Sequence, residues 1–550
     1  HARAPQYNMD GTVVQVAKPT LTEKAYFGSA YNFELSAAYV HTFAEKHTID
    51  AKAVFTAAEN EGFNFEAYRK DYLSTTVDQL FAGSSIGMTN TGNAEEGGRL
   101  GFVGRLKYDY ANRYYIEGSF RYDGSDNFAP GHRWGFFPSV AAAWDITEEP
   151  FFKNLNLKNI NLLKLRASYG TTGTETNVNR FGYLSTYNMV ENAVCIGGNL
   201  ISGFNEGALV SPDLLSWYTR RSLNIGIDGS FLDNKLKGSA DYFFYVTKGG
   251  LTSPADRYIT PLGTKLPQIK SDNEHRREGF ELSLRWSDKI GSDIDYEIGA
   301  NMISYRNLWV TNRGEGLSQL KNPYQRNTHQ SDYLGLYLLD NGLYQSIEQV
   351  LGVPRRPEST ETKLGDIVYQ DINGDGKINS EDKVRYGMPI DPQFTYGVDF
   401  LFAYKGFTLS GLFYGTGKRH MMFGVNARKA ESQYVKNKFQ LDYWREDNRN
   451  ATFPRISMVA GVNGENNRIE STFYLRNAAF LRLKNLSLTY DFKHKLLKSA
   501  KWLSTCQVSL TGSNLFTISG VSDYWDPETT NTNGGYPTSR IYSLGVTLGF

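Results

Sequence analysis

Apolar and polar side chains alternate along many stretches of this 550-residue sequence. In residues 99–110, apolar side chains such as Leu100 fall on even positions, whereas Arg99 and Arg105 fall on odd positions. After a short turn, residues 113–123 repeat the pattern. A period of two places successive side chains on opposite faces of a β-strand, so each stretch predicts a strand with one apolar and one polar face.

About fifteen such stretches occur, most of them about 10 residues long. Tilted strands of 9–11 residues can cross an outer membrane, although a soluble antiparallel sheet alternates in the same way. The predicted strands lie near residues 32–43, 46–57, 99–110, 113–123, 136–146, 161–171, 219–231, 236–248, 276–288, 294–306, 393–404, 407–415, 478–491, 502–514 and 541–550.

The connections between these strands distinguish the two alternatives, because short and long connections mostly alternate. Tight turns are predicted at 44–45, 111–112, 232–235, 289–293 and 405–406. Long external loops are predicted near 58–98, 172–218, 249–275, 307–392, 416–477 and 515–540. Outer-membrane barrels combine short periplasmic turns with long external loops, whereas a soluble sandwich has no reason to do so. We therefore predict an all-β fold, a transmembrane antiparallel β-barrel.

Composition agrees with this prediction. Hydrophobic residues make up 40%, and no apolar stretch of about 18 residues occurs, which excludes transmembrane helices but not a barrel. Aromatic residues reach 14%, as expected for strands with aromatic girdles. The net charge of +1 offers no field for nucleic acid, which we exclude as a partner.

The direction of the strands predicts how the chain relates to a whole barrel. If short turns mark the periplasmic side, the strands at 32–43 and 541–550 both run toward the periplasm. A closed barrel with a periplasmic N-terminus has an even number of strands and begins with an upward one. We therefore expect an odd number of strands ahead of His1. The alternating last strand, which ends on Phe550, resembles the signal read by the barrel-assembly machinery, although a sandwich could close with a similar strand.

Residues 371–382 follow the spacing of a calcium loop. Gly376 stands at position six, where the sharp turn requires a positive φ. The oxygen ligands would come from Asp371, Asn373, Asp375, Lys377 (through its carbonyl), Asn379 and Asp382. Asp at position twelve differs from the usual EF-hand and resembles dockerin-type loops. We predict structural Ca²⁺ that stiffens an external loop; the alternative is an Asx-rich turn that binds nothing.

Other candidate residues carry little chemistry. The sequence shows no nucleophile set, phosphate loop or zinc spacing, so we expect no enzymatic activity. Cys195 and Cys506 are expected to be unpaired. Phe243 and Tyr245, on the face opposite Tyr242, could line a barrel lumen, although ordinary filling of the wall is the simpler interpretation.

Several longer motifs run in order from about residue 99 to residue 550. They are 113–125, 133–140 followed by Trp144, 365–376, 394–397, 480–486, 514–516, Asp526-Pro527-Glu528 and the closing strand. These motifs resemble the SusC/RagA-type TonB-dependent transporters of Bacteroidota, whereas residues 1–98 resemble the family only in pattern.

The resemblance implies a 22-stranded barrel in the outer membrane of a Gram-negative bacterium. Its N-terminal plug and first strands are absent from this chain, which supplies the C-terminal part of the barrel. The family imports glycans or oligopeptides with a SusD-like surface lipoprotein, and TonB acts through the N-terminal part. Expected partners are therefore that lipoprotein, TonB, the remaining barrel and plug segment, the substrate and membrane lipid.

Three functions remain open at this stage. The first is TonB-dependent nutrient uptake. The second is a surface receptor or adhesin that uses the barrel without transport. The third, a soluble secreted β enzyme or lectin, fits poorly with the segregation of loop lengths.

Overall fold

The computed structural model describes most of the chain. The described residues are 19–73, 76–176, 178, 180–207, 215–252, 269–359, 361–428, 438–456, 466–521, 524–529 and 538–550. Within them, no helix is both long and apolar enough to cross a membrane.

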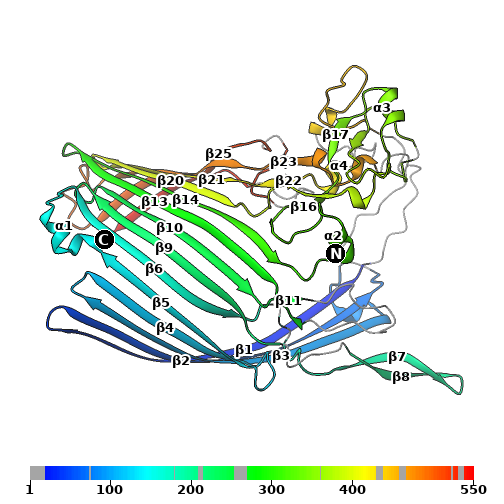
Figure 1. Ribbon diagram of the computed structural model, residues 1–550, viewed down its shortest axis with the longest axis horizontal. Helices are drawn as coiled ribbons and strands as arrows, with labels where there is room; N and C mark the ends of the chain where they lie inside the picture. The colour runs from blue at the N-terminus through cyan, green and yellow to red at the C-terminus, as the bar shows by residue number, and fades with distance from the viewer. Residues whose placement is uncertain are drawn as a thin grey trace.

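One large curved sheet contains fifteen antiparallel strands that pair in chain order, from β1 at one edge to β26 at the other, and a sixteenth, short strand, β15 (Gln330–Ser331), that pairs with β14 (Figure 1). Each predicted strand overlaps one of the fifteen. The strands are β1 (Leu21–Phe43), β2 (His47–Lys70), β3 (Ser84–Tyr110), β4 (Tyr114–Ser125), β5 (Trp134–Asp145), β6 (Ile160–Thr174), β9 (Tyr218–Phe231), β10 (Leu236–Lys248), β13 (Glu274–Ile290), β14 (Ile294–Thr311), β20 (Phe394–Tyr404), β21 (Phe407–Gly417), β24 (Phe480–Asp491), β25 (Thr505–Ser519) and β26 (Ile541–Gly549).

Tight turns at one end of the sheet set the register. Ala44 and Glu45 join β1 to β2 with φ of 47° and 57°, and Ala111 and Asn112 join β3 to β4 with φ of 54° and 58°. Two successive residues in the left-handed region match the twist of the flanking strands in a short hairpin. These connections are the predicted short turns.

The two faces of the sheet differ in chemistry, as the alternation predicts. Leu544 on β26 lies opposite Leu510 on β25, which lies opposite Leu488 on β24. This row is exposed: Leu544 keeps 75% of its surface accessible. We call the face that carries this row the outer face, and the face that carries Ser543 and its polar neighbours the inner face.

The prediction of a long loop at 58–98 is wrong. β2 continues to Lys70 and β3 begins at Ser84, so only residues 71–83 connect them, and β1 begins already at Leu21. The prediction failed because this stretch is rich in glycine and glutamate, which have low strand propensity. Pairing with long neighbouring strands satisfies the backbone and outweighs that local preference.

The other long connections contain short elements. The helices are α1 (Pro150–Asn154), α2 (Leu317–Lys321), α3 (Ile347–Gly352) and α4 (Val425–Arg428). The short strands are β7 (Tyr187–Ile196), β8 (Asn199–Glu206), β11 (Leu251–Thr252), β12 (Ile269–Lys270), β15 (Gln330–Ser331), β16 (Gly335–Tyr337), β17 (Asp340–Leu343), β18 (Ile367–Tyr369), β19 (Val384–Tyr386), β22 (His420–Met422) and β23 (Leu475–Asn477). The β7–β8 hairpin extends away from the sheet (Figure 1).

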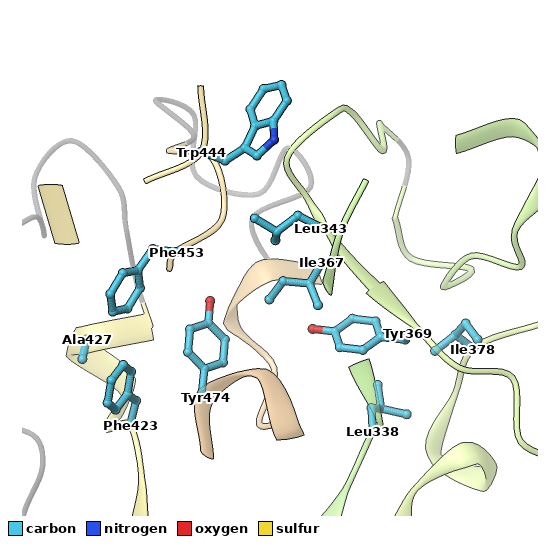
Figure 2. Packing of buried hydrophobic residues seen from close by; sticks show 10 residues of the cluster. All are labelled: Leu338, Leu343, Ile367, Tyr369, Ile378, Phe423, Ala427, Trp444, Phe453 and Tyr474. Atoms are coloured by element: carbon cyan, nitrogen blue, oxygen red, sulfur yellow. The ribbon is translucent and has the colours of Figure 1, made fainter. Parts of the chain in front are cut away.

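The larger of the two buried hydrophobic clusters among the described residues lies in the connections rather than in the sheet. It draws on residues 338–378, between β14 and β20, and on residues 423–474, between β21 and β24. Figure 2 shows Phe423, Phe453 and Tyr474 from the second connection beside side chains from the first. We call the described parts of 312–393 and 418–479 the loop assembly.

Candidate functional site

A groove with a volume of about 990 Å³ lies along β2 to β6 and β9. Polar inner-face side chains, including Ser119, Arg121 and Ser139, line it. The Ser119 and Ser139 hydroxyls lie 2.6 Å apart and hydrogen-bond across β4 and β5. A groove of this size with hydroxyl and guanidinium groups can hold a polar molecule or a polar protein segment.

Ion pairs link neighbouring strands across the inner face. Arg166 on β6 donates to both carboxylate oxygens of Asp228 on β9, at 2.7 and 2.9 Å, and also reaches Asp241 on β10 at 3.1 Å. Arg285 on β13 lies 3.2 Å from Asp399 on β20. These pairs remain partly exposed and bring both signs of charge to the inner face.

The connection from β6 to β9 folds over this face. Arg180 donates to the Asn60 side chain of β2 at 3.3 Å, and Glu175 pairs with Arg99 of β3. Trp217 packs edge-on against the Phe137 ring of β5, with ring centroids 5.5 Å apart. Part of the predicted external loop at 172–218 therefore covers the groove on the inner face of the sheet.

The two aromatic residues considered for the lumen do lie on the inner face. Phe243 and Tyr245 stack with centroids 5.1 Å apart, and Phe243 is only 2% exposed. The guanidinium of Arg220 lies 5.7 Å from the Tyr245 ring. Phe243 is thus packed within the large sheet, which we call the wall, and is not accessible to a ligand.

The predicted calcium loop forms a compact turn. The backbone N–H groups of Gly374 and Gly376 donate to the two carboxylate oxygens of Asp371, at 2.7 and 2.8 Å. The N–H of Lys377 donates to Asp375, and the N–H of Glu381 donates to the Asn379 side chain. Gly376 has a φ of +79°, as position six requires.

The C-terminal end of this loop packs against the rest of the loop assembly. Asp382 is buried, and its carboxylate accepts from the N–H groups of Ile372 (2.9 Å) and Asn379 (2.8 Å), while Ile378 joins the buried cluster. The Asn373 amide nitrogen lies 3.4 Å from an Asp375 carboxylate oxygen. The positive φ at position six and the acceptor at position twelve thus agree with the predicted spacing.

The side chains that could bind a metal ion are less well assembled than the backbone of this loop. Nowhere in the described ranges do three or more His, Cys, Asp or Glu side chains gather closely enough to hold a metal. Bound Ca²⁺ would be held by the carboxylates of Asp371, Asp375 and Asp382, together with Asn oxygens, the Lys377 carbonyl and water. Calcium stays a prediction.

A buried polar network holds the loop assembly together, and the sequence did not predict it. Asp366 is fully buried, pairs with Arg455 at 2.7 Å and accepts from the Asn467 amide at 2.8 Å. Burial raises the pKa of the Asp366 carboxyl above its ordinary value, although the positive charge of Arg455 acts against this shift. Asp366 lies in a recognised family motif, but nothing in the motif indicates its partners.

A second missed cluster joins the wall to the connection between β25 and β26. Arg482 of β24 is 1% exposed; it donates to Asp526 at 2.7 Å and to Thr517 of β25 at 2.8 Å, and pairs with Glu528. Arg419 donates to the neighbouring Pro527 carbonyl at 2.6 Å. Two family motifs quoted above thus meet in space.

The comparison with known proteins decides the family. Residues 3–515 match the family described as TonB dependent receptor-like, beta-barrel. The chain belongs to this family. TonB-dependent receptor P3 of Formosa agariphila is 27% identical over 535 residues, which cover 90% of this chain and 50% of that protein. TonB-dependent receptor SusC of Bacteroides thetaiotaomicron is 26% identical over 475 residues, which cover 82% and 44%.

The solved structures agree on the fold. The RagAB peptide transporter superposes with a TM-score of 0.75 at 22% identity, over 96% of this chain and 56% of that chain. The predicted resemblance, the transmembrane barrel fold and the outer-membrane location are therefore confirmed. The chain spans about half the length of the curated relatives it matches, and the total of 22 strands and the absent plug remain predictions.

Proposed function

We propose that the protein imports oligopeptides or glycans through the outer membrane in a TonB-dependent manner. The observation that carries this proposal is the polar groove on the inner face, where hydroxyl groups and ion pairs could contact a polar substrate during passage. The family and the match to a structure described as a peptide transporter support it. A SusD-like surface lipoprotein would deliver the substrate, and TonB would supply the energy for import.

Uptake by whole cells tests the proposal. A strain that lacks the gene is supplied with labelled oligopeptides and oligosaccharides, with and without a protonophore, and compared with a complemented strain. We expect energy-dependent accumulation of one class only in the complemented strain. Affinity purification of the complete protein should also recover a surface lipoprotein.

The second candidate is a surface receptor or adhesin without transport. The loop assembly favours it, because a connection with its own hydrophobic core can act as a rigid platform for binding. The same experiment separates the two functions. Surface binding that resists the protonophore, with no accumulation inside the cell, would contradict import and support the receptor.

We also propose that residues 371–382 bind structural Ca²⁺. The positive φ of Gly376 and the backbone hydrogen bonds to Asp371 and Asp382 support this proposal. Titration of the full-length protein with Ca²⁺ should show one site with a dissociation constant of about 10⁻⁴–10⁻³ M, as in extracellular modules. The site should be lost in Asp371→Ala and kept in Asp447→Ala, an exposed residue of the loop assembly. An Asx-rich turn without metal would give no saturable binding.

A further inference from the structure

The outer face of β9, β10, β13 and β14 carries a group of charged side chains at the end away from the short turns. These four strands pair in order and lie side by side (Figure 1). We call this group the rim patch; it consists of Arg221, Lys248, Glu274, Arg276, Glu278 and Arg306. Its four cations and two carboxylates give a net charge of +2.

Strand pairing places the rim patch directly above the apolar surface of the wall. Arg221 and Arg276 both lie opposite Val246 of β10. The Arg276 guanidinium lies 5.1 Å from the centre of the Phe244 ring. Phe280 lies four residues after Arg276 on the same face of β13 and is 47% exposed. The cations therefore begin where the row of exposed apolar side chains ends.

The height of the patch follows from strand length. β10 begins at Leu236, directly after a short turn, and Val246 is the eleventh residue of the strand. A tilted strand crosses the hydrocarbon layer in about 9–11 residues. Arg221 and Arg276 consequently lie at the level where hydrocarbon gives way to lipid headgroups.

The cations of the patch are not fully occupied within the protein. Glu274 bridges Lys248 at 2.7 Å and Arg276 at 3.4 Å. The Nε of Arg276 is nevertheless buried without a hydrogen-bond partner, and the side chain of Arg221 forms neither a hydrogen bond nor an ion pair with any residue that the structure describes. Two guanidinium groups in one row, on the two sides of β10, can thus bind an external anion.

At the same distance from the short turns, the outer face carries different side chains elsewhere on the wall. Over β3 to β5 the outer face carries stacked rings, with centroids of Tyr122 and Trp134 4.7 Å apart and those of Phe102 and Trp134 6.3 Å apart. Aromatic rings at the interface suit any headgroup. The excess of cations is a local property of β9 to β14.

We propose that the rim patch binds the phosphate-bearing headgroup of a lipid in the outer leaflet. Guanidinium groups match phosphate oxygens in a bidentate geometry, and basic sites beside membrane-spanning segments bind anionic headgroups. Phe244 and Phe280 would contact the acyl chains of the same lipid. This proposal depends on the outer-membrane location and is independent of the import proposal.

The test compares two double variants of the complete protein. Arg221→Gln with Arg276→Gln alters the outer face, and Arg220→Gln with Arg277→Gln alters the inner face. The second pair consists of the adjacent residues in the same strands, whose guanidinium groups lie 5.7 and 4.7 Å from inner-face tyrosine rings. Both variants lose two positive charges at the same height, so only the face differs.

Each protein is reconstituted in phosphatidylcholine bilayers that contain a phosphorylated glucosamine lipid or its dephosphorylated form, and retained lipid is counted by native mass spectrometry. We expect the wild type and the inner-face variant to retain the phosphorylated lipid, and the outer-face variant to retain about tenfold less. Equal retention of the dephosphorylated lipid by the wild type, or equal losses in both variants, would overturn the proposal.

Two controls keep the test decisive. Displacement of the lipid by millimolar inorganic phosphate would also overturn the proposal, because it would show a site for the free ion. A heat-dependent shift in gel mobility verifies that each variant forms a folded barrel. If the outer double variant does not fold, Arg221→Gln alone replaces it, because the side chain of this exposed residue forms no hydrogen bond or ion pair with the described residues.

Discussion

The wall and the loop assembly place apolar side chains in opposite ways. Leu544 in the wall is 75% exposed and belongs to a whole row of exposed leucines, whereas Tyr474 in the loop assembly is fully buried. In the membrane the outer face meets hydrocarbon, so exposure of leucine there carries no hydrophobic cost. Outside the membrane, water drives the same kinds of side chain into a core.

Polar groups also differ between the two regions, because they stay partly exposed in the wall and are buried in the loop assembly. Arg166 of the wall keeps its ion pairs on the open inner face, whereas Asp366 of the loop assembly is completely buried with Arg455 and Asn467. Partly exposed pairs contribute little to stability, and a buried pair is costly to break. The loop assembly should therefore respond to single substitutions as a water-soluble domain does, and the wall should respond mainly to charge on its outer face.

The largest contrast is expected from truncation of an apolar side chain. Tyr474→Ala should destabilise the loop assembly by about 3–5 kcal/mol, because it leaves a cavity beside Phe423 and Phe453. Leu544→Ala should cost less than about 1 kcal/mol, because lipid chains fill the space. Hydrogen exchange of the two regions in the reconstituted protein measures both effects. Equal sensitivity of wall and loop assembly would refute the inversion.

The junction between the wall and the connection from β25 to β26 is tested through Arg482. Arg482→Met leaves the carboxylates of Asp526 and Glu528 without their main partner and should weaken the attachment of this segment by about 3–5 kcal/mol. Proteolysis should then cut near residues 524–529 while the barrel remains intact. The matched variant Arg121→Met removes a wall arginine from its partly exposed pair with Asp123 and should change stability by about 0–1 kcal/mol. Similar effects of the two variants would show that the cluster is not a structural junction.

Charge on the outer face should be the wall's main weakness. Leu544→Arg, in the middle of β26, should destabilise the barrel by about 2–4 kcal/mol, because the charge would enter hydrocarbon. Ser543→Arg, one residue away on the inner face, should have little effect. Urea unfolding in lipid vesicles gives both values. A larger effect of the Ser543 variant would reverse the assignment of the two faces.

The sequence predicted the wall far better than the loop assembly, and the reason is physical. A strand that faces two environments must alternate, so β26 or β10 can be recognised from about ten consecutive residues. The failure at 58–98 shows the limit of this signal, because Gly62, Gly92 and Gly97 weaken the pattern in strands that pairing nevertheless extends.

The loop assembly has no comparable periodic signal. Asp366 and Asn467 are 101 residues apart, and the buried cluster combines single residues from many short segments. The calcium loop was visible only because its spacing is local, and the Arg482 cluster was visible only as two separate motifs. Contacts of this kind depend on the tertiary structure and cannot be read from spacing.

The smallest predicted effect is the change of stability with pH. Its sign differs between the carboxyl groups of Asp526 and Asp366. Burial acts to raise the pKa of Asp526, but hydrogen bonds from the Glu528 N–H and from Arg482 hold the pKa below its ordinary value of 3.8. Its stabilising contribution is therefore present above about pH 3.8 and is lost as the pH falls through the lower folded value. For Asp366 the folded pKa is raised, so acidification relieves the cost of burying its charge.

Acid should consequently loosen the junction before it loosens the loop assembly. Pepsin digestion between pH 4 and pH 2 should release fragments that end near residues 524–529 earlier than fragments from 338–378. In Asp526→Asn the junction should no longer become more sensitive as the pH falls, whereas Asp366→Asn should leave the junction profile unchanged. Earlier cleavage of the loop assembly in the unaltered protein would mean that the Asp366–Arg455 pair, and not the Arg482 cluster, is the element that acid breaks first.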